Sequence, residues 1–219
     1  MELAADTVRN VKGQLKIWIP ILVIIVFVAG YFYVNKSSVD TSTYRNDTYG
    51  FTLDYPSALT PTTTFATYYH LSNKWRALAG ENEKGTSVIA IPIFSLNQAS
   101  PATGKPYPLY FDAEVRVGVS TVISTCYMRD ALYTKQTVTN ETINGVPFKK
   151  FLFSGAGMSQ YVEGASYRTV HDNKCYVLEQ LKAGASYRDP SMKVGISDAT
   201  LNGYYKSGEK IIKTFQFTK

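Results

Sequence analysis

The 219-residue chain contains few of the residues from which most catalytic and metal-binding sites are built. It has two histidines, His70 and His171, two cysteines, Cys126 and Cys175, and only 18% charged residues. A zinc site needs three or four ligands, and a nucleophile needs a base beside it. Because suitable side chains are so scarce, we predict no catalytic residue, no metal ligand and no bound cofactor.

The chain also lacks a block of charge of one sign. Its net charge is +6, and the 23 Lys and Arg residues are dispersed along the sequence. A nucleic-acid-binding protein usually concentrates its positive charge on one face or in one tract. We therefore expect no nucleic-acid partner, and the doublet Lys149-Lys150 is too small to form a binding patch.

No motif of a phosphate-binding or acid–base site occurs in the chain. The glycine-rich stretch 154–159 lacks the lysine of a phosphate-binding loop, so we interpret it as a flexible connection between strands. Glu114 and Glu163 are isolated acids, which we interpret as solvated strand residues. His171 and Asp172 are adjacent at a predicted turn, and we interpret them as polar residues at strand ends.

One long apolar run is present, in residues 17–34, which contain no charged side chain. A helix of this length covers about 27 Å, enough to cross the hydrocarbon core of a bilayer. Trp18 lies near one end and Tyr31 and Tyr33 near the other, and aromatic rings favour the membrane interface. The run therefore predicts one transmembrane anchor.

The charges before this run predict its orientation. Arg9, Lys12 and Lys16 place the segment 1–16 in the cytoplasm and the rest of the chain outside it. Cleavage as a signal peptide is the alternative, because Ala29-Gly30 are small, but the bulky residues that follow favour an uncleaved anchor. We expect a single-pass protein of a bacterial cell membrane whose main domain is extracytoplasmic.

Beyond the anchor, residues 35–43 are short and polar and form a predicted linker, followed by one domain over 44–219. Cys126 and Cys175 both lie in this domain. An even count in an oxidising compartment favours one disulfide between them. The alternatives are two free buried thiols, or a catalytic thiol paired with a histidine.

Strand patterns dominate the predicted domain. In the segment 49–57, YGFTLDYPS, every second residue is apolar until Pro56 ends the pattern. Residues 88–94 are apolar on both faces, which indicates an interior strand covered on each side, while Pro92 indicates an edge or a bulge. Residues 113–120 alternate between small apolar and polar side chains.

Two turn signals, Asn144-Gly145 and Asp172-Asn173, predict consecutive hairpins and so an antiparallel sheet. Residues 203–214 are the best helix candidate, although Gly208 weakens it, and 214–219 form a last short strand. An apolar strand covered on both sides needs helices or loops on its second face. The chain is therefore predicted to be α+β.

Several sequence motifs of this domain follow one another along the chain in the same order as in one protein family. The ends carry G-F-x-x-x-Y-P at 50–56 and T-F-x-F at 214–217. Between them stand AEVRVGVS, INGVPFKKFLFSGAGM and HDNKCYVLEQL. Over residues 44–219 the chain resembles membrane-anchored bacterial proteins with a PsbP-like domain.

The resemblance implies a central antiparallel sheet with helices on both faces, an α/β/α sandwich. PsbP itself is an extrinsic photosystem II subunit that docks on a membrane complex without catalytic residues of its own. We therefore expect a non-enzymatic, membrane-tethered domain that binds or scaffolds an envelope protein or complex. The alternatives are an envelope hydrolase built around His70, His171 or acidic strand residues, and a small-ligand or glycan-binding module that uses some of the 17 tyrosines.

Overall fold

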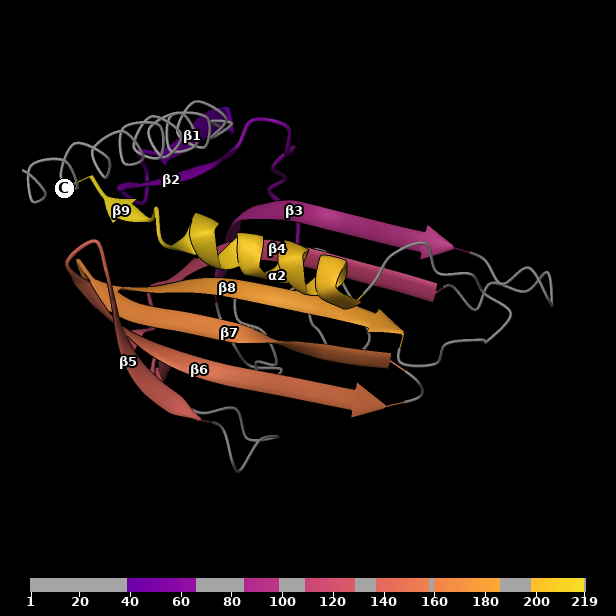
Figure 1. Cartoon of the computed structure of the whole chain (residues 1–219). Helices are drawn as coiled ribbons and strands as arrows, with labels where there is room; N and C mark the ends of the chain where they lie inside the picture. The colour runs from indigo at the N-terminus through magenta and orange to yellow at the C-terminus, as the bar shows by residue number, and fades with distance from the viewer. Residues whose placement is uncertain are drawn as a thin grey trace, which may run out of the picture. The chain divides into compact units, whose positions relative to one another are not determined.

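The structure is a computed structural model that describes residues 39–65, 85–98, 109–128, 137–157, 160–185 and 198–218. These residues form two antiparallel sheets and one α-helix, α2 (Asp198–Ile212). The larger sheet has the order β3-β4-β8-β7-β6-β5, and the smaller has the order β1-β2-β9 (Figure 1). The strands are β1 (Thr41–Asn46), β2 (Phe51–Pro56), β3 (Thr86–Gln98), β4 (Leu109–Ser120), β5 (Val138–Ile143), β6 (Val146–Gly157), β7 (Gln160–His171), β8 (Lys174–Ala185) and β9 (Gln216–Phe217).

Two-residue turns set the register of the larger sheet. Asn144 and Gly145 join β5 to β6 with φ angles of 47° and 82°. Asp172 and Asn173 join β7 to β8 with φ angles of 45° and 54°. Asparagine, aspartate and glycine adopt this left-handed backbone at lower cost than other residues, and it matches the twist of a hairpin. Both predicted hairpins are confirmed.

The strand β3 lies at the edge of the larger sheet, with a register shift between Pro92 and Phe94. Pro92 predicted an edge strand or a bulge, and this prediction is confirmed. The prediction from the apolar run, that this strand lies in the interior of the sheet, is wrong. The residues from Val88 to Ile91 are nevertheless all buried. They are apolar on both sides because both faces of the sheet are covered at this point.

The helix α2 packs on β4, β8 and β3 of the larger sheet, and the smaller sheet lies beyond its C-terminal end (Figure 1). Gly208 faces the sheet. A Cβ at this position would lie 3.1 Å from Gln180 Cγ, 3.1 Å from Ile93 Cδ1 and 3.2 Å from Val115 Cγ2. The residue that weakens the helix in isolation is therefore the one that lets the helix lie close to the sheet.

The opening and closing segments of the domain meet in the main core. Phe51 and Leu53 of β2 are fully buried, and the Phe51 ring stacks on Phe215 with 5.1 Å between ring centroids. Phe51 also meets Tyr176 of β8 edge-on. The alternation predicted for YGFTLDYPS is confirmed, because its apolar face closes the core between the two sheets and α2.

The predicted central antiparallel sheet and a covering helix are present. The prediction placed helices on both faces of the sheet. Within the described ranges α2 is the one α-helix, so the prediction is confirmed for one face only. No helix in the described part of the chain is long and apolar enough to cross a membrane, and the run 17–34 lies outside that part. The strand β1 begins at Thr41, inside the range 35–43 predicted as linker.

Candidate functional site

The strand β6 passes from the core to the surface along its length. On the side that faces α2, Phe148 is buried, Lys150 is half-buried, Leu152 is 45% exposed and Ser154 is exposed. Phe148 packs edge-on against Phe215, at the covered end of the strand. Part of this sheet face, at the end of β6 and the start of β7, is therefore open beside the helix.

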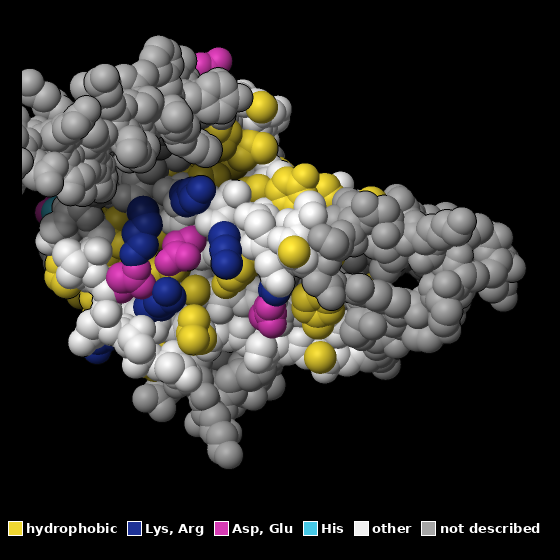
Figure 2. Space-filling view, viewed as in Figure 1, with side chains coloured by type: hydrophobic (Ala, Val, Ile, Leu, Met, Phe, Trp, Pro, Cys, Tyr) yellow, Lys and Arg dark blue, Asp and Glu magenta, His cyan; other side chains and the backbone are white. Residues whose placement is uncertain are grey.

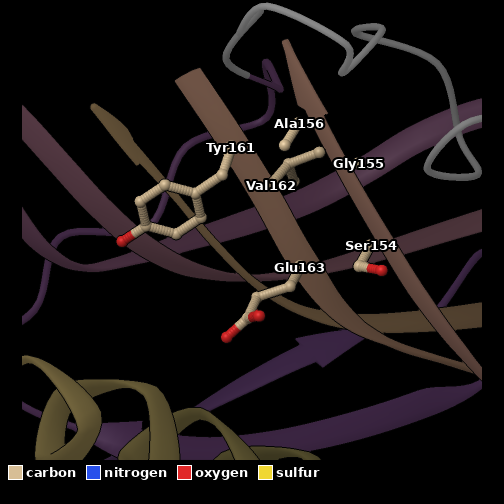
Figure 3. Close-up of a pocket in the computed structure, with 6 residues that line it drawn as sticks. All are labelled: Ser154, Gly155, Ala156, Tyr161, Val162 and Glu163. Atoms are coloured by element: carbon tan, nitrogen blue, oxygen red, sulfur yellow. The ribbon is translucent and has the colours of Figure 1, made fainter. Parts of the chain in front are cut away.

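A cavity of 440 Å³ lies on this open part of the sheet. It is lined by Ser154, Gly155 and Ala156 of β6 and by Tyr161, Val162 and Glu163 of β7. Glu163 is the register partner of Ser154, and Tyr161 of Ala156, so these four side chains share one face. Figure 3 shows Tyr161 and Glu163 projecting from the same side of β7, with Ser154 on the neighbouring strand.

Lys182 of β8 contacts Glu163 on the side opposite to β6. The two residues are register partners, and Lys182 Nζ forms an ion pair with Glu163 Oε1. Lys182 Nζ also donates a hydrogen bond to Asn202 Oδ1 of α2 at 3.1 Å and lies 5.2 Å from the centroid of the Tyr205 ring. The Lys182 side chain is 15% exposed and that of Glu163 46% exposed, so the carboxylate is the accessible member of the pair.

The phenols beside this pair stay protonated near neutral pH. Burial raises the pKa of Tyr205 to about 12, and the nearby Tyr167 and Glu163 act in the same direction. Burial also raises the pKa of Tyr167, which Lys150 opposes. Tyr205 therefore presents a neutral hydroxyl group rather than a phenolate to the site, while the Tyr167 hydroxyl is buried beneath it.

A second group of charges lies on the same face. Glu141 of β5 forms ion pairs with both Lys150, at 3.1 Å, and Lys213. Lys150 Nζ in turn lies 4.9 Å from the centroid of the Tyr167 ring. Figure 2 shows basic and acidic side chains interspersed with hydrophobic ones on the face that carries α2. We call the exposed or half-buried side chains Lys150, Leu152, Ser154, Ala156, Tyr161, Glu163 and Tyr205 the α2-side surface.

The opposite face of the larger sheet carries a buried charged row. Arg116 of β4, Glu179 of β8 and Ser166 of β7 are register partners and are all fully buried. Arg116 Nε pairs with Glu114 Oε1, and its guanidinium lies 5.0 Å from the centroid of the Phe65 ring. The row places one buried polar side chain on each of three neighbouring strands.

Glu114 differs from its prediction as a solvated strand residue, because it is only 3% exposed. Burial raises the pKa of Glu114, while the charge and hydrogen bond of Arg116 lower it. The reason for the difference is that β4 is the second strand of the sheet and both of its faces are covered. The sequence signal is the spacing Glu-x-Arg, which places opposite charges on one face of a strand.

Arg168 lies beside this row on β7. Its Nε donates to Ser166 Oγ at 3.0 Å, and its Nη1 donates to the Met128 carbonyl oxygen at 2.7 Å. The guanidinium lies 4.1 Å from the centroid of the Phe151 ring. Its contacts are hydrogen bonds and ring stacking within the fold, which favours a role in holding the loop at Met128 on the sheet.

The predicted disulfide is present between Cys126 and Cys175, with 5.6 Å between their Cα atoms. It ties the turn η1 (Ile123–Thr125) to the start of β8. The Val170 amide donates a hydrogen bond to the Tyr127 hydroxyl at 3.2 Å beside it. Both cysteines are fully buried, so the bond serves the packing of this end of the sheet.

The remaining candidates lie apart from one another. The His171 ring stacks on Phe217 with 3.8 Å between centroids, and His171 Nε2 lies 3.5 Å from Asp172 Oδ2. His70 lies outside the described residues. Among the residues that the structure describes, no three His, Cys, Asp or Glu side chains are grouped so that they could hold a metal ion.

The stretch 154–159 was predicted to be a flexible connection. Its first four residues continue β6, and the last two lie outside the described part of the chain. Glu163, predicted to be an unpaired solvated acid, is instead the partner of Lys182. Sequence reasoning missed this pair and Tyr205 because the register of β7 with β8 and the position of α2 bring them together.

No protein-family model and no curated protein matches the sequence. Among solved structures, the chain is similar to the solution structure of cyanobacterial PsbP (CyanoP) from Synechocystis sp. PCC 6803. The TM-score is 0.42 and the identity 8%, over 84% of this chain and 95% of that chain. Membership of the PsbP-like family stays a prediction from the sequence motifs.

Proposed function

We propose that this chain is a membrane-tethered, extracytoplasmic binding domain that docks a protein of the cell envelope through its α2-side surface. The observation that supports the proposal is the open sheet face beside α2. It combines the exposed Leu152, the half-exposed Glu163 and the aromatic rings of Tyr161 and Tyr205. Apolar and aromatic side chains with satisfied polar neighbours are typical of protein interfaces.

The polar groups of this surface favour binding over catalysis. Glu163 is paired with Lys182, and Lys150 with Glu141. A nucleophile needs a base beside it to be activated. The phenol of Tyr205, with its pKa raised to about 12, is a poor nucleophile at neutral pH. We therefore assign no reaction to the α2-side surface.

The extracytoplasmic location is supported by two sequence features and one contact. The run 17–34 carries no charge and follows three basic residues. The disulfide between Cys126 and Cys175 is of the kind that persists in oxidising compartments. Together they favour a domain held close to the outer side of the membrane.

Site-specific photo-cross-linking in intact membranes tests the proposed function. A benzophenone amino acid replaces the exposed Leu152 in one variant, and the exposed Ala58, in the turn that follows β2, in a matched control. We expect a reproducible protein adduct from position 152 and none from position 58. The absence of an adduct at 152, or the same adducts from both positions, contradicts the proposal.

A further inference from the structure

We propose that the cavity beside the end of β6 and the start of β7 receives an arginine side chain of the partner protein. This inference rests on the proposed function and specifies the chemistry of that contact. The cavity combines a carboxylate, Glu163, an aromatic ring, Tyr161, and a hydroxyl, Ser154, on one face of two neighbouring strands. These are the three kinds of group that recognise a guanidinium.

The carboxylate has room for a second cation. Lys182 approaches Glu163 from β8 and pairs with Oε1, whereas the cavity lies between β7 and β6, on the other flank of Glu163. A carboxylate accepts about four hydrogen bonds through its two oxygens, so one ammonium group does not exhaust it. The Glu163 side chain is also three times as exposed as that of Lys182 (46% against 15%).

The aromatic wall of the cavity is held in place before a partner binds. Tyr161 packs against the cluster of Phe111, Ala113 and Leu201, which includes the first turn of α2. A fixed ring loses little conformational entropy when a side chain stacks on it. Arginine stacks on aromatic rings and pairs with carboxylates through its planar fork, and these contacts favour it over lysine.

The size of the cavity suits a long side chain. Gly155 and Ala156 add almost no side-chain volume to the wall on β6, and the space amounts to 440 Å³. This volume falls within the range of about 300–1,000 Å³ typical of ligand pockets. An arginine side chain can therefore enter from the solvent without displacing a core residue.

The test uses the full chain in detergent micelles and NMR amide shifts, with N-acetyl-arginine amide as the probe. N-acetyl-citrulline amide, which has nearly the same shape without the charge, is the matched probe control. We expect arginine to shift the amide signals of Gly155 and Glu163 in a saturable manner and citrulline to shift neither. Equal shifts from both probes, or no shift from arginine, overturn the inference.

Three variants assign the binding to the cavity. We expect Glu163→Gln to weaken arginine binding at least tenfold, because a charge-assisted pair is lost. Ala156→Leu fills the cavity at an exposed position without a change of charge, and it should weaken binding to a similar extent. Asp47→Asn removes an exposed acid that pairs with Arg45 on another part of the surface and should leave binding unchanged. Binding that survives both cavity variants overturns the inference.

The two proposals fail in different ways. If position 152 captures the same partner with the same yield in wild type and in Glu163→Gln, the arginine contact is contradicted and the proposed function stands. If the arginine probe binds in the cavity and position 152 captures no protein, the proposed function is contradicted instead.

Discussion

Arg116 and Glu179 face each other across β4 and β8, and neither has any exposed surface. Glu114 pairs with the same arginine, and Arg168 lies on the neighbouring strand of the same sheet face. The set contains two basic and two acidic side chains. Balanced charges lower the free-energy cost of burying each one, so the loss of a single member leaves an excess charge in the interior.

Replacing Arg116 by methionine should lower the free energy of unfolding by about 3–5 kcal/mol, because the buried Glu114 loses its ion-pair partner and the buried set keeps an excess negative charge. Urea denaturation followed by circular dichroism measures the change. The control is Arg45→Met, which breaks the exposed pair with Asp47 and should cost at most about 1 kcal/mol. Equal losses of stability from the two substitutions would contradict the claim that the buried charges stabilise the fold more than an exposed ion pair does.

Stability should depend on pH through Glu114. Burial raises its pKa above the ordinary value of 4.5, with Arg116 opposing the shift. The folded chain then holds this proton more tightly than the unfolded chain, so the contribution of Glu114 to the free energy of unfolding falls as pH rises above 4.5. It becomes constant above the pKa of the folded state.

Urea titrations of wild type and Glu114→Gln at a series of pH values between about 4 and 8 measure this effect. We expect the stability of wild type relative to the variant to decrease as pH rises. A relative gain of wild type over the same range contradicts the account, since it means that Arg116 dominates over burial and holds the pKa below its ordinary value.

Two glycines of α2 should respond to alanine in opposite directions. Gly208→Ala adds a Cβ 3.1 Å from both Gln180 and Ile93, and the resulting shift of the helix should cost about 1–3 kcal/mol. Gly203→Ala adds a Cβ with nothing within 4 Å, and it should stabilise the helix by about 0.5–1 kcal/mol. Thermal unfolding of both variants is the measurement, and a stabilising Gly208→Ala would disprove the close packing of α2.

The disulfide should contribute about 4 kcal/mol to the free energy of unfolding, because it closes a loop between residues 49 positions apart. Denaturation with and without a reductant measures this contribution in wild type. The double variant Cys126→Ser, Cys175→Ser should show no effect of the reductant. An equal effect on both proteins would assign the change to something other than this bond.

Maleimide labelling of intact cells checks the disulfide in its native compartment. Because the cysteines are bonded and fully buried, they should resist labelling until the chain is unfolded and reduced. Labelling of the denatured chain without a reductant would show that the bond does not form in the cell.

Local patterns predicted the strands and turns because they need only neighbouring residues. The Asn144-Gly145 turn follows from residues that tolerate positive φ, and the burial of Phe51 and Leu53 follows from a period of two. An antiparallel sheet was predicted on the same basis, from two consecutive hairpins, and its central place in the domain was implied by the resemblance. The edge position of β3 was signalled by Pro92 alone, against a strongly apolar run that favoured the interior.

The candidate site was less predictable because it depends on contacts between distant residues. Glu163 meets Lys182 through the register of two strands, and Tyr205 reaches them only once α2 lies on the sheet. The buried pair of Glu114 and Arg116 was missed for a related reason. An alternating strand normally has one solvated face, and only the tertiary structure shows that both faces of β4 are covered.

Photo-cross-linking from position 152 in intact membranes tests the central claim most directly. Leu152 is an exposed apolar residue of the α2-side surface, while Ala58 is an exposed control in the turn that follows β2. The proposal predicts one reproducible envelope-protein adduct at 152 that is absent at 58. No adduct at 152, or identical adducts at the two positions, would contradict a binding role for the α2-side surface.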